Sequence, residues 1–332
     1  MQLSILDQAP ISAGMTAQDA LHASTELARI GDRLGYTRYW MAEHHDLSGL
    51  ACPSPDVMLG IIGAKTTSIR IGSGAVLLPH YKPFRVAETY NLLATLYPRR
   101  VDLGIGRAPG GSAEVTMALS DNFLENVRKM PDMLDDLLRF LNDDFPKDHM
   151  YAKIRPSPVP KSSPNPWLLG TSEKSAVLAA QKGMAYTFGH FMSNQDGPSI
   201  VRKYVNGFSK KYELRKPKVI VTISVICAET TEEAEKLALS GQLWSVKRAK
   251  GEDIGIPTVE EAKNYSYTAD DLALIKKAKN KMIIGNPKEV KLQLEEIQKT
   301  YDVNELMIVT ITHSTKAKLK SYELIAKEIL SN

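Results

Sequence analysis

The sequence predicts a single (β/α)8 barrel spanning residues 1–332, with an insertion between the seventh and eighth strands. Short apolar runs alternate with amphipathic helical stretches along the chain, a pattern typical of parallel βα units. The alternation occurs eight times, and a right-handed succession of eight units closes readily into a barrel within 332 residues. A doubly wound open sheet is the alternative arrangement of the same units.

The first four units fill the N-terminal half. The capping pattern from Thr16 to Asp19 opens the first helix, and Gly35 ends it. Further helices begin near Pro55 and at Pro83, because proline suits the first turn of a helix. A longer helix is predicted over residues 121–141. The strands themselves are predicted at residues 2–6, 38–42, 69–74 and 101–105.

The last four units follow a proline-rich connector, residues 146–166. Their strands are predicted at residues 166–169, 185–188, 219–228 and 305–311, with helices at 172–183, 198–211, from Thr231 onward and at the C-terminus. Residues 244–284 lie outside this alternation and form the predicted insertion. Long loops at the catalytic end of a barrel act as lids, so this segment is a candidate lid; a plain surface insertion is the alternative.

The composition is that of an ordinary soluble domain. Hydrophobic residues make up 43% of the chain, charged residues 24%, and the net charge of +4 does not indicate nucleic-acid or membrane binding. Cys52 and Cys227 cannot build a disulfide framework, and no apolar run is long enough to span a membrane. The N-terminal residues show no secretory leader pattern. We therefore expect a cytoplasmic protein.

Histidines follow three of the predicted strands. The second strand runs into a Glu-His-His-Asp sequence, while His80 follows the third strand and His190 the sixth. Catalytic groups collect at the strand ends of barrels, and histidine suits proton transfer near neutral pH. Because side chains alternate along a strand, Glu43 and His45 share one face and His44 takes the other. No HxH or HExxH spacing occurs, so we expect no metal.

Two further strand ends suit a phosphate. The fourth strand runs into a glycine-rich loop that carries Arg107, and a guanidinium can bind phosphate through two hydrogen bonds. The fifth strand runs into a Gly-Thr-Ser sequence and directly opens a helix, whose N-terminal N–H groups can bind an anion. The alternative interpretations are a simple N-cap for Ser172 and a surface ion pair for Arg107.

Small residues close the third strand, which ends in Ser73-Gly74-Ala75. Without bulky side chains at this level, a flat aromatic ring system can lie close to the backbone. The same residues equally suit a narrow barrel mouth that is filled by its own side chains.

Six segments in chain order carry a resemblance to a known family. They read LDQAPI at residues 6–11, YWMAEHH at 39–45, IGSGAV at 71–76, LPHY at 78–81, DLGIGRAP at 102–109 and LGTS at 169–172. Their combination, over nearly the whole chain, resembles the bacterial luciferase-like flavin-dependent monooxygenases, specifically the branch that begins with an LDQxPI strand.

The resemblance implies a (β/α)8 barrel that binds reduced FMN (FMNH2) at its C-terminal mouth. His44 matches the histidine that relatives use in acid–base handling of the flavin–oxygen adduct. Gly106 stands where luciferase carries a reactive cysteine, so light emission is not implied. The implied cofactor-binding residues are Gly74 and Ala75, joined by a cis peptide beneath the flavin ring, Arg107, Ser172 and Ser175 at the phosphate, and Gly170 and Thr171 beside them. Glu43, His45, His80 and His190 are the expected neighbouring or substrate-contacting residues.

The predicted function is an FMNH2- and O2-using monooxygenase acting on a small organic substrate. No GxGxxG site follows the first strand, so a separate NAD(P)H:flavin reductase is the expected source of FMNH2. A homodimer is expected, formed through helices at residues 55–66 and 83–96. Two alternatives remain open: a deazaflavin (F420)-dependent hydride-transfer enzyme on the same barrel, and a non-catalytic flavin-binding protein.

Overall fold

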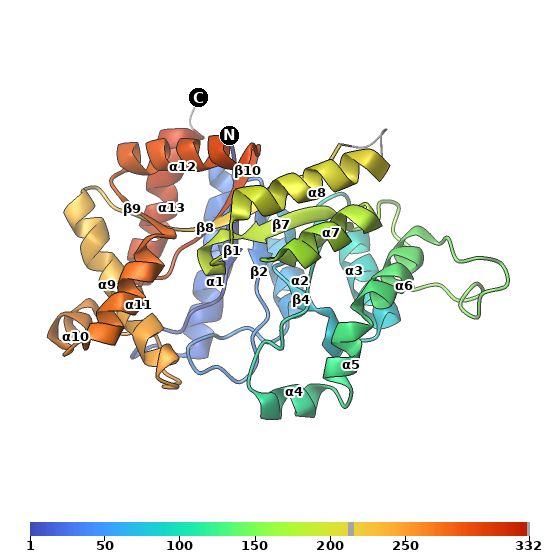
Figure 1. Ribbon diagram of the computed structural model, residues 1–332, viewed down its shortest axis with the longest axis horizontal. Helices are drawn as coiled ribbons and strands as arrows, with labels where there is room; N and C mark the ends of the chain where they lie inside the picture. Colours follow the sequence, from blue (N-terminus) through green and yellow to red (C-terminus); the bar gives the residue numbers. More distant parts are fainter. Residues whose placement is uncertain (212–215, 331–332) are drawn as a thin grey trace.

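The computed structural model describes residues 1–211 and 216–330, and it forms the predicted (β/α)8 barrel (Figure 1). Neighbouring barrel strands pair in parallel, and β10 closes the barrel by pairing with both β8 and β1. The barrel strands are β1 (Gln2–Asp7), β2 (Arg38–Met41), β3 (Arg70–Ser73), β5 (Val101–Gly106), β6 (Asn165–Gly170), β7 (Ala185–Gly189), β8 (Val219–Cys227) and β10 (Glu305–Val309).

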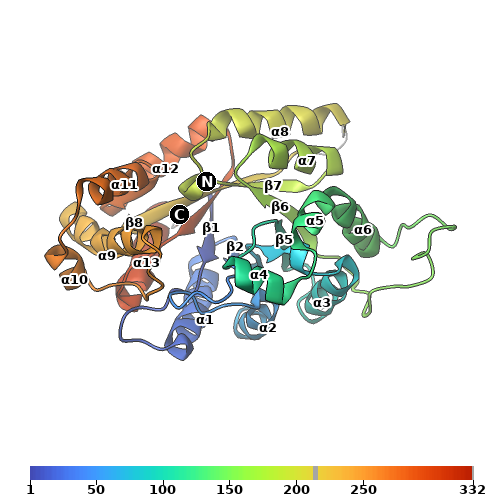
Figure 2. The same ribbon diagram turned by 60° about the horizontal axis from the view of Figure 1, so that its bottom comes forward.

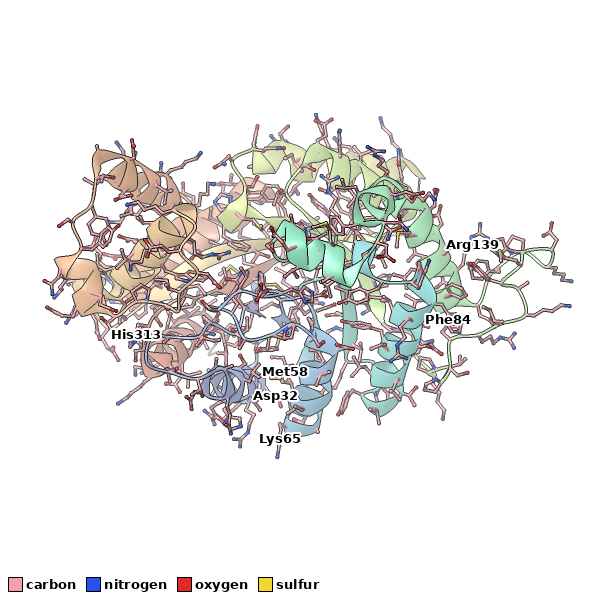
Figure 3. The ribbon with its side chains drawn as sticks, turned by 90° about the horizontal axis from the view of Figure 1, so that it is seen from below. Asp32, Met58, Lys65, Phe84, Arg139 and His313 are labelled. Atoms are coloured by element: carbon pink, nitrogen blue, oxygen red, sulfur yellow. The ribbon has the colours of Figure 1, made fainter. Side chains whose placement is uncertain are left out.

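Helices surround the barrel, and Asp32, Lys65, Phe84 and Arg139 mark α1, α2, α3 and α6 in turn around it (Figure 3). They comprise α1 (Ala17–Leu34), α2 (Pro55–Lys65), α3 (Pro83–Leu96), α6 (Met130–Asn142), α7 (Glu173–Lys182), α8 (Gly197–Lys211), α12 (Pro287–Tyr301) and α13 (Thr315–Ile329). The predicted capping box of α1 is confirmed, and Gly35 ends the helix at φ 82°. Within the described part of the chain, no helix is both long and apolar enough to cross a membrane.

The third barrel strand is interrupted at its C-terminal end. The peptide bond between Gly74 and Ala75 is cis, as the resemblance implies. A short strand, β4 (Val76–Leu77), resumes the pairing with β5, and a single 3-10 turn, Leu78–His80, follows it. Strand β3 agrees with the predicted strand at residues 69–74 to within one residue at each end, whereas β4 was not predicted.

The segment after β5 differs from its prediction. We predicted one helix over residues 121–141, but the structure has α4 (Ala113–Leu119), α5 (Phe123–Arg128) and α6. Pro131 lies in the first turn of α6 and has no N–H to donate, so a helix cannot continue through it from α5. The first of these helices, α4, begins directly after the glycine-rich loop and lies with α5 at the bottom of Figure 1, the side that comes forward in Figure 2.

The predicted insertion contains helices and a strand of the sheet. Helix α9 (Thr231–Ala249) runs unbroken through the predicted boundary at residue 244, and α10 (Val259–Asn264) and α11 (Ala269–Lys279) pack on it. Strand β9 (Met282–Gly285), which we did not predict, extends the sheet beside the C-terminal end of β8. These elements gather on one side of the barrel (Figure 1).

The barrel interior contains apolar side chains and a buried ion network. Arg38, at the start of β2, donates hydrogen bonds to Glu305 (Nε–Oε1 2.6 Å) and Asp102 (Nη1–Oδ2 2.6 Å). Its guanidinium also lies 4.8 Å from the ring centroid of Trp167. Because Arg38 and Glu305 begin their strands, the network lies at the N-terminal end of the barrel, where residues contribute to stability.

Candidate active site

The end of β2 is organised around the buried carboxylate of Glu43. Its Oε1 atom accepts hydrogen bonds from the hydroxyl of Tyr81 (2.7 Å) and from Nε2 of His45 (2.9 Å). Its Oε2 atom accepts one from the backbone N–H of Leu77 (3.1 Å). Burial, and then the Glu43 charge, raise the pKa of Tyr81, so its hydroxyl stays a donor. Glu43 thus joins β2, β4 and the following turn.

His45 and His80 lie beside this carboxylate. Their ring centroids are 5.9 Å apart, with planes at 73°. The backbone N–H of His45 donates to the carbonyl of Gly110 (2.9 Å), and Nε2 of His80 bonds to the carbonyl of Pro109 (2.8 Å). The His80 ring also stacks on Phe123 at 4.7 Å. Both histidines therefore fix the loop that follows β5.

His44 points elsewhere and lacks such anchoring. Its backbone N–H donates to the carbonyl of Cys52 (3.0 Å), but its buried Nδ1 atom has no hydrogen-bond partner among the described residues. Burial, and then the charges of Arg248 and His45, lower the pKa of His44 to about 4. The imidazole is therefore neutral near pH 7 and can accept or relay a proton.

The structure does not bring His190 into this cluster. Its Nδ1 atom bonds to the hydroxyl of Tyr301 (2.7 Å), which belongs to the outer helix α12. Burial, and then the charge of Lys281, lower the pKa of His190. Its position after a strand end made it a candidate site residue, but its ring contacts helix α12 and not the Glu43 cluster.

The loop after β5 presents Arg107 to solvent. This side chain makes no hydrogen bond or ion pair with any residue that the structure describes, so the alternative of a surface ion pair is not realised. Gly106 precedes it, and a Cβ atom there would lie 3.1 Å from that of Ala75. The glycine keeps the end of β5 close to the cis peptide of the third strand.

The start of α7 forms the second predicted phosphate site. Ser172 is the N-cap, and its hydroxyl accepts a hydrogen bond from the N–H of Ser175 (3.4 Å), whose own hydroxyl donates to the Ser172 carbonyl (2.6 Å). A Cβ atom on Gly170 would lie 2.2 Å from the Ser175 hydroxyl oxygen, so this approach needs glycine. The carbonyl of Thr171 accepts from Ser193 (3.3 Å). The N-cap interpretation of Ser172 is thus confirmed, and the remaining first-turn N–H groups can still receive an anion.

Sequence reasoning missed two contributors at this end of the barrel. Tyr81, part of the LPHY segment, bonds directly to Glu43. Arg248, in the last turn of α9, lies close enough to His44 to influence its pKa. No sequence motif identifies Arg248, because about two hundred residues of the chain separate it from His44. No group of three or more His, Cys, Asp or Glu side chains that could hold a metal ion occurs in the described ranges.

Comparisons with known proteins agree with this arrangement of a parallel barrel whose polar residues gather at the strand ends. Residues 1–303 match the model of the luciferase-like monooxygenase family. The chain belongs to this family and is an oxidoreductase. It is 44% identical over 330 residues to the uncharacterised protein YceB of Bacillus subtilis (strain 168), covering 99% of this chain and 100% of that one. It is 35% identical over 332 residues to N-acetyl-S-alkylcysteine monooxygenase of the same organism, covering 100% and 99%.

Solved structures share the barrel. Apo-MsnO8 superposes with a TM-score of 0.87 at 32% identity, covering 100% of this chain and 99% of that one. More distant chains show the fold alone: the oxygenating constituent of 3,6-diketocamphane monooxygenase from Pseudomonas putida, in complex with FMN (TM-score 0.72, 18% identity, 99% and 98% covered), and an F420-dependent secondary alcohol dehydrogenase (TM-score 0.68, 15% identity, 99% and 98% covered).

Proposed function

We propose that this protein is a monooxygenase that binds FMNH2 at the C-terminal mouth of the barrel and uses O2 to oxidise a small organic substrate. The observation that carries the proposal is the pair of free anion-binding groups beside small strand ends. Arg107 has no partner among the described residues, and the first turn of α7 keeps unused N–H groups. Both follow neighbouring strands, β5 and β6.

The residues fit FMN in further respects. Arg107, Ser172 and Ser175, with the backbone at Gly170 and Thr171, would hold the phosphate. Gly74 and Ala75 carry no large side chain, so a flat ring could approach the backbone at the end of the third strand. When bound, reduced flavin supplies the electrons that activate O2.

His44 is the proposed acid–base residue. Its buried Nδ1 atom has no partner among the described residues, and the same is true of Nδ1 of His80. The ring of His80 is nevertheless held at Nε2 by the carbonyl of Pro109, and that of His45 is held at Nε2 by Glu43. A general base needs a ring nitrogen that is free to take up the proton. Among these three histidines, only His44 has no side-chain hydrogen bond at either ring nitrogen within the described residues.

The partners follow from the same proposal. A separate NAD(P)H:flavin reductase would deliver FMNH2. N-acetyl-S-alkylcysteine monooxygenase is 35% identical over the whole chain, so N-acetyl-S-methylcysteine is the first organic substrate to test.

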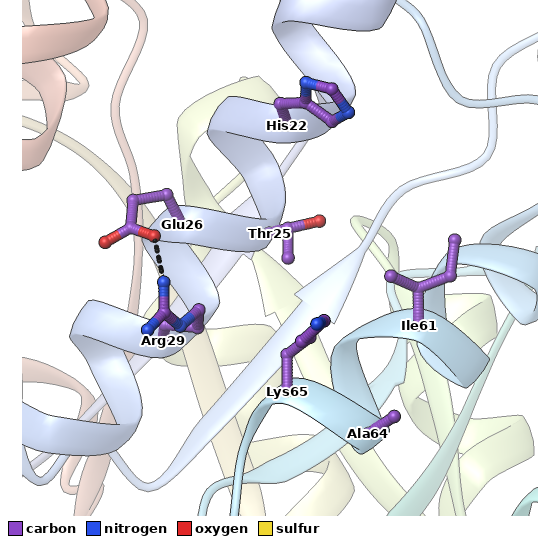
Figure 4. A pocket seen from close by; sticks show the side chains of 7 residues that line it. All are labelled: His22, Thr25, Glu26, Arg29, Ile61, Ala64 and Lys65. Atoms are coloured by element: carbon purple, nitrogen blue, oxygen red, sulfur yellow. Dashed lines mark hydrogen bonds and ion pairs between the residues drawn. The ribbon is translucent and has the colours of Figure 1, made fainter.

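A homodimer through α2 and α3 belongs to the proposal. Four large apolar side chains on these adjacent helices face solvent: Val57 (62% exposed), Ile61 (46%), Leu92 (49%) and Leu96 (57%). Ile61 also lines a surface pocket between α1 and α2, where Glu26 and Arg29 form an ion pair (Figure 4). Burying this apolar face in a symmetric interface would stabilise a pair of chains.

Anaerobic fluorescence titrations test the cofactor. We expect FMNH2 to bind in the micromolar range or tighter, oxidised FMN to bind less tightly, and F420 not to bind. Tight binding of F420 without binding of FMNH2 would instead support hydride transfer by a deazaflavin. Tight FMN binding by a protein that never consumes O2 would support a flavin-binding role.

A further inference from the structure

The last turn of α9 carries a positive charge that has no counter-ion. Lys247 pairs with Glu252 (Nζ–Oε2 3.3 Å), and Lys250 pairs with Asp271 (Nζ–Oδ2 2.8 Å). Arg248 is exposed, and within residues 1–211 and 216–330 its side chain has no hydrogen bond or ion pair. Its guanidinium carbon lies 4.7 Å from the ring centroid of Trp244. Stacking on an aromatic face leaves the N–H donors at the guanidinium edge free.

Trp244 is a fixed support for this arginine. Its Nε1 donates to the carbonyl of Ile254 (3.0 Å), and its ring packs with Leu50 and Ile256. Gly49 lies so close that an added Cβ would be 2.5 Å from the Ile254 carbonyl oxygen. The end of α9 is therefore tied to the loop that follows β2, and this loop contains His44 and His45.

The insertion is attached to the barrel mouth at other points too. The backbone N–H of Ser48 donates to both carboxylate oxygens of Asp253 (2.8 and 3.0 Å). Ala13, in the loop after β1, donates its N–H to the carbonyl of Ile256 (2.8 Å). These bonds hold the insertion against the ends of β1 and β2. The end of α9, which carries Arg248, is therefore fixed against the loop that contains His44.

We propose that Arg248 binds an anionic group of the organic substrate, so that the enzyme selects substrates carrying a carboxylate. This inference rests on the proposed monooxygenase function and adds a specificity-determining residue to it. A planar guanidinium binds a carboxylate through two parallel hydrogen bonds. Arg107, on the loop after β5, is the proposed partner of the flavin phosphate, so the phosphate and the substrate anion would be bound by different arginines.

Equilibrium binding tests the inference without turnover. The probes are N-acetyl-S-methylcysteine and its methyl ester, titrated by calorimetry into flavin-free and FMN-loaded protein. We expect the acid to bind the Arg248→Met variant about 10- to 100-fold more weakly than wild type, the range for losing charge-assisted hydrogen bonds. The ester should bind wild type and Arg248→Met equally weakly. Arg248→Lys should bind the acid more tightly than Arg248→Met does, but less tightly than wild type.

Lys236→Met, which removes another exposed cation of α9, is the matched control and should bind both probes like wild type. The inference is wrong if Arg248→Met weakens the binding of the acid and of the ester equally, or if wild type does not bind the acid more tightly than the ester. Anaerobic FMNH2 titration of each variant reports the proposed function separately. If wild type does not bind FMNH2, the proposed function is refuted. If wild type binds FMNH2 but does not prefer the acid to the ester, only the role of Arg248 is refuted.

Discussion

Nε2 of His45 lies 2.9 Å from Oε1 of Glu43, and both side chains are buried. The pairing confirms that Glu43 and His45 share one side of the strand end, as alternation predicts. It also divides the roles of two adjacent histidines. His45 is committed to a structural carboxylate, while His44 keeps an unpartnered ring nitrogen.

Replacing His44 should therefore affect catalysis. His44→Ala should leave FMNH2 affinity within about twofold and lower turnover by roughly 10²–10⁴-fold, the usual contribution of acid–base assistance. His45→Ala should act mainly on stability, because it leaves one oxygen of the buried Glu43 with fewer donors. Steady-state kinetics and chemical denaturation of both variants separate these effects. A larger kinetic defect in folded His45→Ala would show that the roles are reversed.

Arg107 should contribute to the binding of phosphate only. Arg107→Ala should weaken FMN binding by about 1.5–3 kcal/mol, the range for a hydrogen bond to a charged group. The binding of riboflavin, which lacks the phosphate, should be weakened much less by the same substitution. Fluorescence titration measures both ligands, and Arg128→Ala is the control because Arg128 is another exposed arginine of this region. Equal losses for FMN and riboflavin would exclude Arg107 from the phosphate site.

The fold should lose stability in acid through Asp7. Burial opposes its ionisation, but the ion pair with Lys318 (Nζ–Oδ1 2.6 Å) and the hydrogen bond from Tyr39 outweigh it and hold the pKa of Asp7 below its usual value. An Asp in an unfolded chain has a pKa of about 3.9. Because the pKa of Asp7 is lower in the folded protein, its ionised carboxylate stabilises the fold fully above the unfolded pKa. This stabilisation is lost as the pH falls from there through the folded-state pKa.

Asp7→Asn tests this dependence by urea denaturation at several pH values. The variant should be about 3–5 kcal/mol less stable at pH 7, because the buried Lys318 loses its counter-ion. Its stability should fall less steeply than that of wild type as the pH drops below about 5. Glu296→Gln, at an exposed position of α12, should follow wild type. An unchanged slope in Asp7→Asn would contradict the assignment.

The dimer proposal predicts a monomer after two substitutions. Ile61→Asp with Leu92→Glu places two charges on the exposed apolar face of α2 and α3, and burying unpaired charges in an interface is costly. Leu292→Glu changes an exposed leucine on α12 (65% exposed), away from α2 and α3, and should leave the dimer intact. Sedimentation velocity distinguishes these results. A wild-type monomer at micromolar concentration would refute the dimer.

Local signals in the sequence predicted much of the fold. The capping residue Thr16 and the terminating Gly35 act within a few residues, and both were identified correctly. Strand β9 was missed because its four residues carry no alternation and its stability comes from pairing with distant β8. The break at Pro131 was also overlooked, although the proline itself is a local signal against a continuous helix.

The candidate site was only partly predictable for the same reason. Motifs identified His44, Arg107 and Ser172, because each stands at a strand end or opens a helix. His190 also follows directly after a strand, yet its ring forms a hydrogen bond with Tyr301 of a distant helix. The electrostatic influence of Arg248 on His44 depends on how the end of α9 packs against the loop after β2, and a single sequence carries no signal for such a long-range contact.

The reaction of the FMNH2-loaded protein with O2 tests the central claim most directly, and it needs no knowledge of the substrate. Anaerobic complex is mixed rapidly with oxygenated buffer while O2 uptake and the absorbance of oxidised FMN are followed together. Our account predicts that O2 is consumed before oxidised FMN reappears, with a delay that is altered in His44→Ala. Oxidation of bound FMNH2 at the rate of free FMNH2, with O2 uptake and flavin absorbance changing together, would contradict it.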